Sequence, residues 1–129
     1  FKENTMIHYK IDKYTIGGAL QYYTHKIFEE AGLQYREDEI KDGDVFAFAY
    51  LEDERATNFF CKPVKGRIVD FMFYEYKKNG ELKKNGVSCY ARIYADTYED
   101  AVKGFNILIQ NRLKRLKEEI NRVENLLIA

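Results

Sequence analysis

The first apolar pattern in the chain has the period of a strand. From Thr5 to Asp12 every second residue is apolar, which predicts a half-buried strand. The period then changes, because apolar residues recur at three- and four-residue spacing until Gly32, which suits a left-handed helix cap. This segment predicts a helix over residues 17–31.

The middle of the chain predicts a hairpin with a buried strand. Residues 45–51 are apolar on both faces, as expected of a strand covered on both sides. A second short run, residues 58–61, can return beside it. Pro63 has no amide proton for a ladder, so we expect it to close that strand and to open a turn that ends at Gly66.

The clearest alternation runs over residues 67–77 and 87–95, which are joined by a polar linker with two Asn-Gly pairs. We expect these segments to form the longest hairpin. Val87, Cys89, Ala91, Ile93 and Ala95 would share one face of the second strand, which predicts that this face is in the core. The opposite face, which includes Arg92 and Tyr94, would be wet or covered by a partner.

A long C-terminal helix is predicted over residues 97–127. Asp96, Thr97, Tyr98 and Glu99 form a capping box, in which the Asp96 carboxylate accepts a first-turn amide and Glu99 reaches back. The apolar positions that follow are Tyr98, Val102, Phe105, Ile109, Leu113, Leu116, Ile120, Val123 and Leu127. From Ile109 onward their steps alternate between four and three, as in a coiled coil.

The length of this helix predicts how it is used. About thirty residues extend for roughly 45 Å, whereas a compact domain of this size has a radius of gyration of about 14 Å. We therefore expect the second half to project and to pair with another copy of the chain. Two alternatives are that the helix lies along its own sheet, or that it breaks near Asn121 into two helices.

Together these elements predict one α+β domain over residues 1–129. It would contain an antiparallel sheet of about five strands, one N-terminal helix packed on the sheet and the long C-terminal helix. The length of 129 residues fits a single core.

Charge and composition exclude several classes of function. The 21 basic and 21 acidic residues cancel, which argues against a dedicated duplex-DNA binder. No apolar run approaches the roughly 18 residues that cross a bilayer, and no signal-peptide pattern opens the chain. We therefore expect no membrane partner and a cytoplasmic location, where Cys61 and Cys89 would remain thiols.

The candidate catalytic patterns are incomplete. Asp70, Glu75 and Lys77 resemble a metal-nuclease set, but on a single strand residues 70 and 75 would point to opposite faces. His8 and His25 lie in different predicted elements and have no neighbour at metal-ligand spacing. We therefore expect no catalytic residues, no metal and no cofactor, and a protein that is not an enzyme.

The C-terminal helix carries the sharpest binding pattern. Between Lys103 and Lys117 it has five basic residues and no acid, and Arg112 and Arg115 lie three apart on one surface. Guanidinium groups bind phosphates in a bidentate way, and the nearby Arg92 and Tyr94 could contact a nucleotide base or sugar. These residues favour a small phosphate-bearing ligand at a subunit boundary. The alternative is that the arginines pair with Glu118, Glu119 and Glu124 or are simply solvated.

Residues 64–129 resemble the phage-encoded anti-Thoeris sponges in layout. The shared features are an antiparallel sheet, a capped strand-to-helix junction at Asp96 and a C-terminal helix with paired arginines. Those sponges oligomerise and sequester a cyclic ADP-ribose signal. The resemblance implies that Arg112 and Arg115 contact phosphate, that Arg92 and Tyr94 contact ribose or base, and that Asp96 is a helix cap with a ligand role.

The resulting hypothesis is a non-enzymatic homo-oligomer that sequesters a small cyclic nucleotide-like signal. As a phage anti-defence protein it would act in the host cytoplasm. The rival hypothesis is a phage-type inhibitor or assembly factor that binds another protein. Its binding surface would be the acidic face of residues 37–54, where Asp38, Asp42 and Asp44 would present clustered carboxylates.

Overall fold

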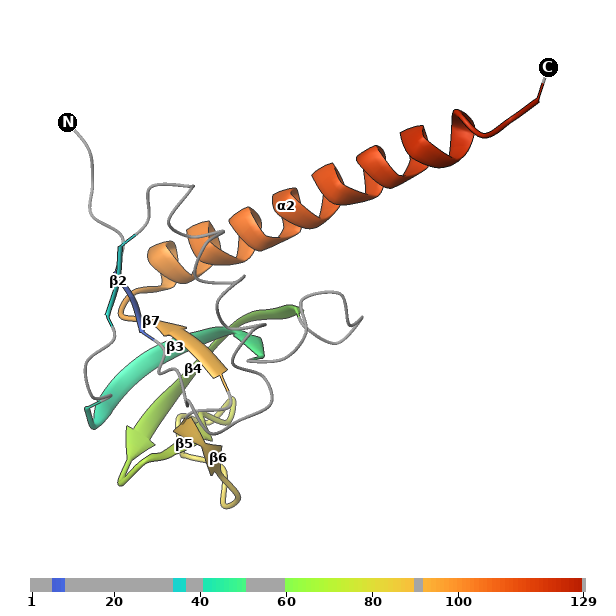
Figure 1. The fold of residues 1–129 in the computed structure, drawn as a ribbon. Coiled ribbons are helices and arrows are strands. Elements are labelled where there is room, and N and C mark those ends of the chain that lie inside the picture. The colour runs from blue at the N-terminus through green and yellow to red at the C-terminus, as the bar shows by residue number, and fades with distance from the viewer. Residues whose placement is uncertain (1–5, 9–33, 37–40, 51–59, 90–91, 129) are drawn as a thin grey trace.

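The computed structural model describes residues 6–8, 34–36, 41–50, 60–89 and 92–128 of the chain. Within these ranges the chain forms one sheet and one long helix (Figure 1). The strands are β1 (Met6–His8), β2 (Gln34–Arg36), β3 (Gly43–Tyr50), β4 (Phe60–Val69), β5 (Met72–Glu75), β6 (Val87–Ser88) and β7 (Arg92–Ala95), and the helix is α2 (Tyr98–Glu124).

The strand order in the sheet is β2-β1-β7-β3-β4-β5-β6. Every neighbouring pair is antiparallel except β1 with β2, which is parallel. The predicted α+β class, antiparallel sheet and C-terminal helix are therefore confirmed. The predicted helix over residues 17–31 and most of the predicted first strand lie outside the described residues.

Strand β3 occupies the middle of the sheet between β7 and β4, as its two apolar faces predicted. A register shift between Ala47 and Ala49 interrupts its ladders with both neighbours. The shift changes which face the next side chain occupies. Ala47 therefore packs on one side of the sheet, whereas Phe48 and Ala49 both pack on the side of α2.

Two hydrophobic cores result, one on each side of β3. The core beneath α2, here called the helix-side core, consists of Phe48, Ala49, Ile93, Ala95, Ala101 and Leu108. The core on the opposite side, here called the inner core, consists of Val45, Ala47, Ile68, Phe73, Cys89 and Tyr94.

The predicted end of a strand at Pro63 is wrong. Pro63 lies inside β4, which continues to Val69. It sits where β4 pairs irregularly with β3, between the partners Phe60–Ala49 and Val64–Ala47. A proline can be accommodated there because the regular ladder is already interrupted.

The predicted strand over residues 67–77 is divided by a tight turn at Asp70 and Phe71. Both residues have positive φ angles, 50° and 65°, and β5 begins directly afterwards. The Asp70 amide donates to Asp42 Oδ1 at 3.0 Å. This side-chain contact from another segment helps to hold a backbone conformation that residues other than glycine rarely adopt.

The predicted strand over residues 87–95 is also divided. Val87 and Ser88 pair with β5 at one edge of the sheet, whereas Arg92–Ala95 pairs with β3 and β1. Cys89 consequently lies in the inner core and Ile93 in the helix-side core, so the two do not share a face. Ile93, Tyr94 and Ala95 are all buried, which means that β7 is covered on both faces.

Helix α2 begins at Tyr98 and packs its first half on the sheet. Ala101, Gly104 and Leu108 are its buried residues. A Cβ atom at Gly104 would stand 2.6 Å from the Phe48 ring, so glycine permits the close approach of helix and sheet. The helix runs without interruption past Asn121 to Glu124, which excludes the predicted alternative of two helices.

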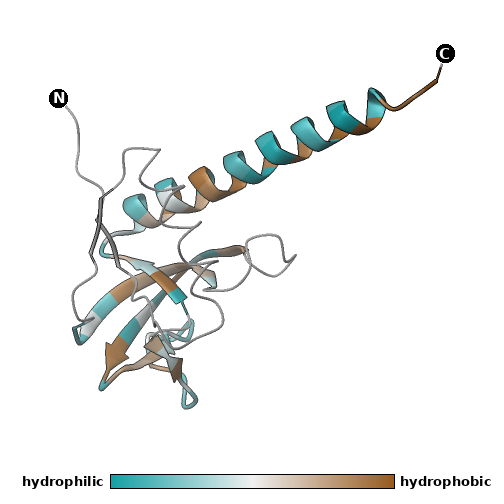
Figure 2. Cartoon of the chain, viewed as in Figure 1, coloured by the Kyte–Doolittle hydropathy of each residue, from teal (hydrophilic) through white to brown (hydrophobic). Residues whose placement is uncertain are grey.

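The second half of α2 extends away from the sheet (Figure 1). Its apolar residues lie along one side and remain exposed, from 44% at Leu116 to 82% at Leu127 just beyond the helix (Figure 2). These residues, here called the outer stripe, are Leu113, Leu116, Ile120, Val123 and Leu127. The expectation that this half projects from the domain is therefore met.

Candidate functional site

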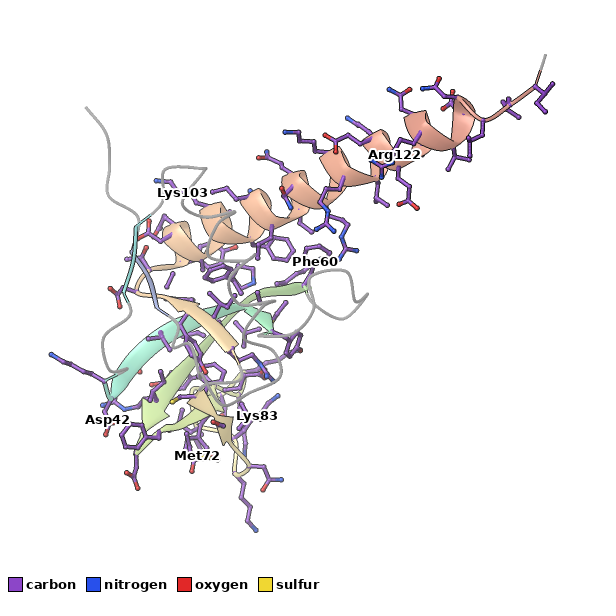
Figure 3. The ribbon with its side chains drawn as sticks, viewed as in Figure 1. Asp42, Phe60, Met72, Lys83, Lys103 and Arg122 are labelled. Atoms are coloured by element: carbon purple, nitrogen blue, oxygen red, sulfur yellow. The ribbon has the colours of Figure 1, made fainter. Side chains whose placement is uncertain are left out.

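Arg112 lies where α2 leaves the sheet. Its guanidinium carbon stands 5.1 Å from the centre of the Phe60 ring, which comes from the first residue of β4 (Figure 3). Phe60 in turn meets Phe105 of α2 edge to face. The Arg112 guanidinium is thus held against an aromatic surface, which suits a cation–π contact.

One nitrogen of Arg112 has an unusual environment. Nη2 is buried and has no hydrogen-bond partner among the residues that the structure describes. A buried guanidinium nitrogen without an acceptor is costly, because it has lost water and gained nothing in exchange. A phosphate or carboxylate oxygen bonded to Nη2 would relieve this cost, but it would first have to displace the atoms that cover this nitrogen.

Arg115 follows one turn later and is partly buried. A surface hollow of about 400 Å³ joins these two arginines to Arg122. The described residues that line it are Arg112, Arg115, Leu116, Glu118, Glu119 and Arg122. Three cations and two carboxylates therefore line one hollow. A small anion would bind at the part of the hollow where the arginines are nearer to it than the carboxylates.

The contribution of Arg122 was not foreseen from the sequence. It follows Arg115 by seven residues, which is two helical turns, so it lies on nearly the same face. The signal was therefore present in the spacing, although it lay outside the basic run between Lys103 and Lys117.

Arg92 lies on the other side of the sheet. Ile93 packs beneath α2, and the alternation of a strand turns the side chain of Arg92 to the face of Tyr94. There its guanidinium carbon stands 4.1 Å from the centre of the Tyr50 ring. Burial raises the pKa of the neighbouring Cys61 thiol, and the charge of Arg92 offsets this rise only in part.

Tyr94 is fully buried in the inner core, where its ring packs against Phe73 at 5.2 Å between centroids. Within the described part of the chain, its hydroxyl has no hydrogen-bond partner. Burial raises the pKa of this hydroxyl far above its ordinary value, and Cys89 adds a smaller contribution. The hydroxyl therefore remains protonated, and in this arrangement the side chain is out of reach of a ligand at the surface.

Asp96 is exposed and precedes the helix, but it is not the cap. Thr97 is the N-cap residue, and its Oγ1 accepts from the Asp100 amide at 3.1 Å. The prediction that Asp96 caps the helix is wrong by one residue. A side-chain oxygen nevertheless accepts an amide of the first turn, as predicted, and this amide is that of Asp100.

The five residues predicted from the sequence are therefore not gathered in one place within a single chain. Arg112 and Arg115 share the hollow on α2, whereas Arg92 and Tyr94 lie on the opposite face of the sheet. Asp96 stands at the junction between sheet and helix. Ligand contacts from all five stay a prediction.

The acidic region contains one well-organised cluster. Asp44 accepts from the Tyr76 hydroxyl at 2.6 Å and from Arg67 at 3.1 Å, and Lys65 lies 4.0 Å away. The hydrogen bond from Tyr76 is the largest cause that holds the pKa of Asp44 below its ordinary value. Because two cations already compensate Asp44, its charge contributes little to an acidic docking face.

The other acidic residues predicted to bind a partner are placed differently. Asp42 accepts the Asp70 amide within the same chain, and Asp38 lies outside the described residues. Glu75, part of the nuclease-like set, bonds to Lys83, while Asp70 lies in the turn before its strand.

Within the described ranges, no three His, Cys, Asp or Glu residues are close enough to hold a metal ion. None of the helices in those ranges combines the length and apolarity that a membrane crossing requires. Comparison with protein-family models, with curated proteins and with solved structures finds no match to this chain.

Proposed function

We propose that this protein is a non-enzymatic binding protein that self-associates through α2 and captures a small phosphate-bearing ligand beside that helix. The observation that carries the proposal is the outer stripe. Apolar residues repeat on one side of the second half of α2, and no other described element lies beneath that half. Such a pattern is typical of a helix that is covered by another helix.

The energetic argument for self-association is simple. Each large aliphatic side chain that is fully buried contributes about 1.5–3 kcal/mol relative to exposure. Five such side chains per copy could offset the loss of freedom on association, which costs about 4–15 kcal/mol. A second copy offers the same stripe, so the complementary apolar surface is always present.

The ligand part of the proposal is supported by Arg112. Its buried Nη2 atom has no acceptor from the described ranges of the chain, and Arg115 and Arg122 line the same hollow. A phosphate group has the oxygen geometry that guanidinium groups bind best. A protein that holds such a ligand without converting it would act by sequestration, as the resemblance to the anti-Thoeris sponges implies.

Native mass spectrometry of the purified protein tests both parts, because it reports the number of subunits and any bound small molecule together. We expect the unmodified protein to be a dimer or larger. Ile120→Asp should give a monomer, since it places a charge in the middle of the outer stripe. Arg112→Ala should keep the assembly and lose the bound anion.

Asn121→Asp is the matched control, because it also adds a carboxylate to α2, and Asn121 is exposed and lies outside both the outer stripe and the hollow. It should leave the subunit number unchanged. Circular dichroism of each variant verifies that the fold is retained. A monomeric unmodified protein at tens of micromolar would refute self-association, and an unmodified protein that carries no anion would refute the ligand proposal.

A further inference from the structure

The charged residues that flank the outer stripe allow the direction of the second helix to be inferred, given the proposed self-association. In a coiled coil the apolar positions are a and d, and the residues at e and g border them. Leu113 and Ile120 take position a, and Leu116 and Val123 take position d. The bordering charged residues are then Arg112 and Glu119 at g and Lys117 and Glu124 at e.

A parallel pair of helices would bring like charges together. In that arrangement each g residue faces the e residue that follows it by five positions on the partner. Arg112 would face Lys117, and Glu119 would face Glu124. The two-fold symmetry repeats both contacts, so all four bordering contacts would be repulsive.

An antiparallel pair would bring opposite charges together. Residues 112–117 of α2 carry four cations and no acid, whereas residues 118–124 carry three acids and one cation. When one helix is reversed, the basic segment of each copy lies along the acidic segment of the other. Complementary charge across an interface favours one orientation over its alternative.

The apolar residues also match in the antiparallel direction. Consider two reversed helices aligned so that the Glu118 residues of both copies lie at the same level. Each apolar residue of one stripe then faces an apolar residue of the other, and none faces a polar residue. The layers pair Ile109 with Leu127, Leu113 with Val123 and Leu116 with Ile120 of the second copy. Leu127 continues the last turn beyond the helix, since its amide donates to the Glu124 carbonyl at 3.0 Å.

Arg112 also belongs to the side of α2 that faces the sheet. The face of α2 that packs on the sheet through Ala101 and Leu108 is continued by Arg112 and Arg115. The outer stripe lies about a quarter turn away from that face. The helix can therefore contact its own sheet and a second helix on two different sides.

We propose that the partner of α2 is the α2 helix of a second copy in the antiparallel direction, so that the two sheets stand at opposite ends of the pair. This inference rests on the proposed self-association and adds the direction and the register. In this register Leu113 of one copy contacts Val123 of the other.

Disulfide trapping distinguishes the two directions. Leu113→Cys and Val123→Cys are prepared as separate proteins of different mass, both with Cys61→Ser, while Cys89 stays because it is fully buried. The substituted residues are about half exposed in a single chain, so both variants should fold. An equimolar mixture is oxidised mildly, and the Cys61→Ser protein without a new cysteine is the control.

We expect the mixed disulfide between the two variants to form at least tenfold faster than either disulfide between identical copies. Fast trapping between identical copies would overturn the antiparallel direction and leave self-association intact. Dimers that trap in neither combination would overturn the register. Sedimentation of the unoxidised proteins is run in parallel, and a monomer there would refute the proposed self-association itself.

A charge reversal gives a second, independent test. Glu119→Lys removes a repulsive contact from a parallel pair but extends the basic segment in an antiparallel pair. We expect a dissociation constant raised at least threefold by this substitution, measured by sedimentation equilibrium at low salt. A dissociation constant lowered by Glu119→Lys would overturn the proposal.

Discussion

The two halves of α2 have similar sequence patterns and very different surroundings. In the first half, Ala101, Gly104 and Leu108 are buried against the sheet. In the second half, Leu116 and Ile120 recur with comparable spacing but remain 44% and 56% exposed. Apolar periodicity thus identifies an apolar helix face, but it does not show whether the same chain covers that face.

The halves also differ in the size of the residues that face the cover. The packed half uses small residues, which bring the helix close to Phe48. The projecting half carries leucine, isoleucine and valine, the residue types that fill the space between two helices in coiled coils. The difference supports two kinds of contact on one helix.

The largest contrast between the halves is expected from truncating a leucine in each. Leu108→Ala should lower the free energy of unfolding by about 2–5 kcal/mol, because it leaves a cavity in the helix-side core. Leu116→Ala should change it by less than about 0.5 kcal/mol when the protein is dilute. Urea unfolding at low protein concentration measures both, and equal losses would contradict the comparison.

A smaller contrast is expected from adding alanine to each half. Gly104→Ala should destabilise the fold by about 1–3 kcal/mol, although alanine is the better helix former, because its Cβ meets the buried Phe48 ring. Asn121→Ala should stabilise α2 by about 0.5 kcal/mol, since nothing packs tightly there. Thermal unfolding followed by circular dichroism measures the change in melting temperature for each variant. The two changes should have opposite signs.

The smallest effect is expected at the start of the helix. Thr97→Ala should cost about 1 kcal/mol, because the Asp100 amide loses the Thr97 acceptor. Asp96→Ala should cost about 0.3–0.5 kcal/mol, through its charge near the helix terminus. Urea unfolding measures the free energy of unfolding of each variant. A larger decrease for Asp96→Ala than for Thr97→Ala would identify Asp96 as the principal cap.

The candidate site was predictable only in part. The spacing of Arg112 and Arg115 placed them on one helical surface, and the structure brings them together with Arg122. Phe60, which stacks on Arg112, comes from a strand more than fifty residues earlier, so no local pattern could identify it. The separation of Arg92 from these arginines follows from the sheet face that it occupies.

The amino-acid sequence by itself determined the α+β class, the central buried strand and a long C-terminal helical segment. These features depend on the period of apolar residues and on a cap within a few positions, which are local properties of the chain. The tertiary structure decided the turn at Asp70 and Phe71, the passage of β4 through Pro63 and the burial of both faces of β7. Each of these depends on a partner distant in the sequence, such as Asp42 beside Asp70, or β3 beside β4 and β7, and such partners become neighbours only when the chain has folded.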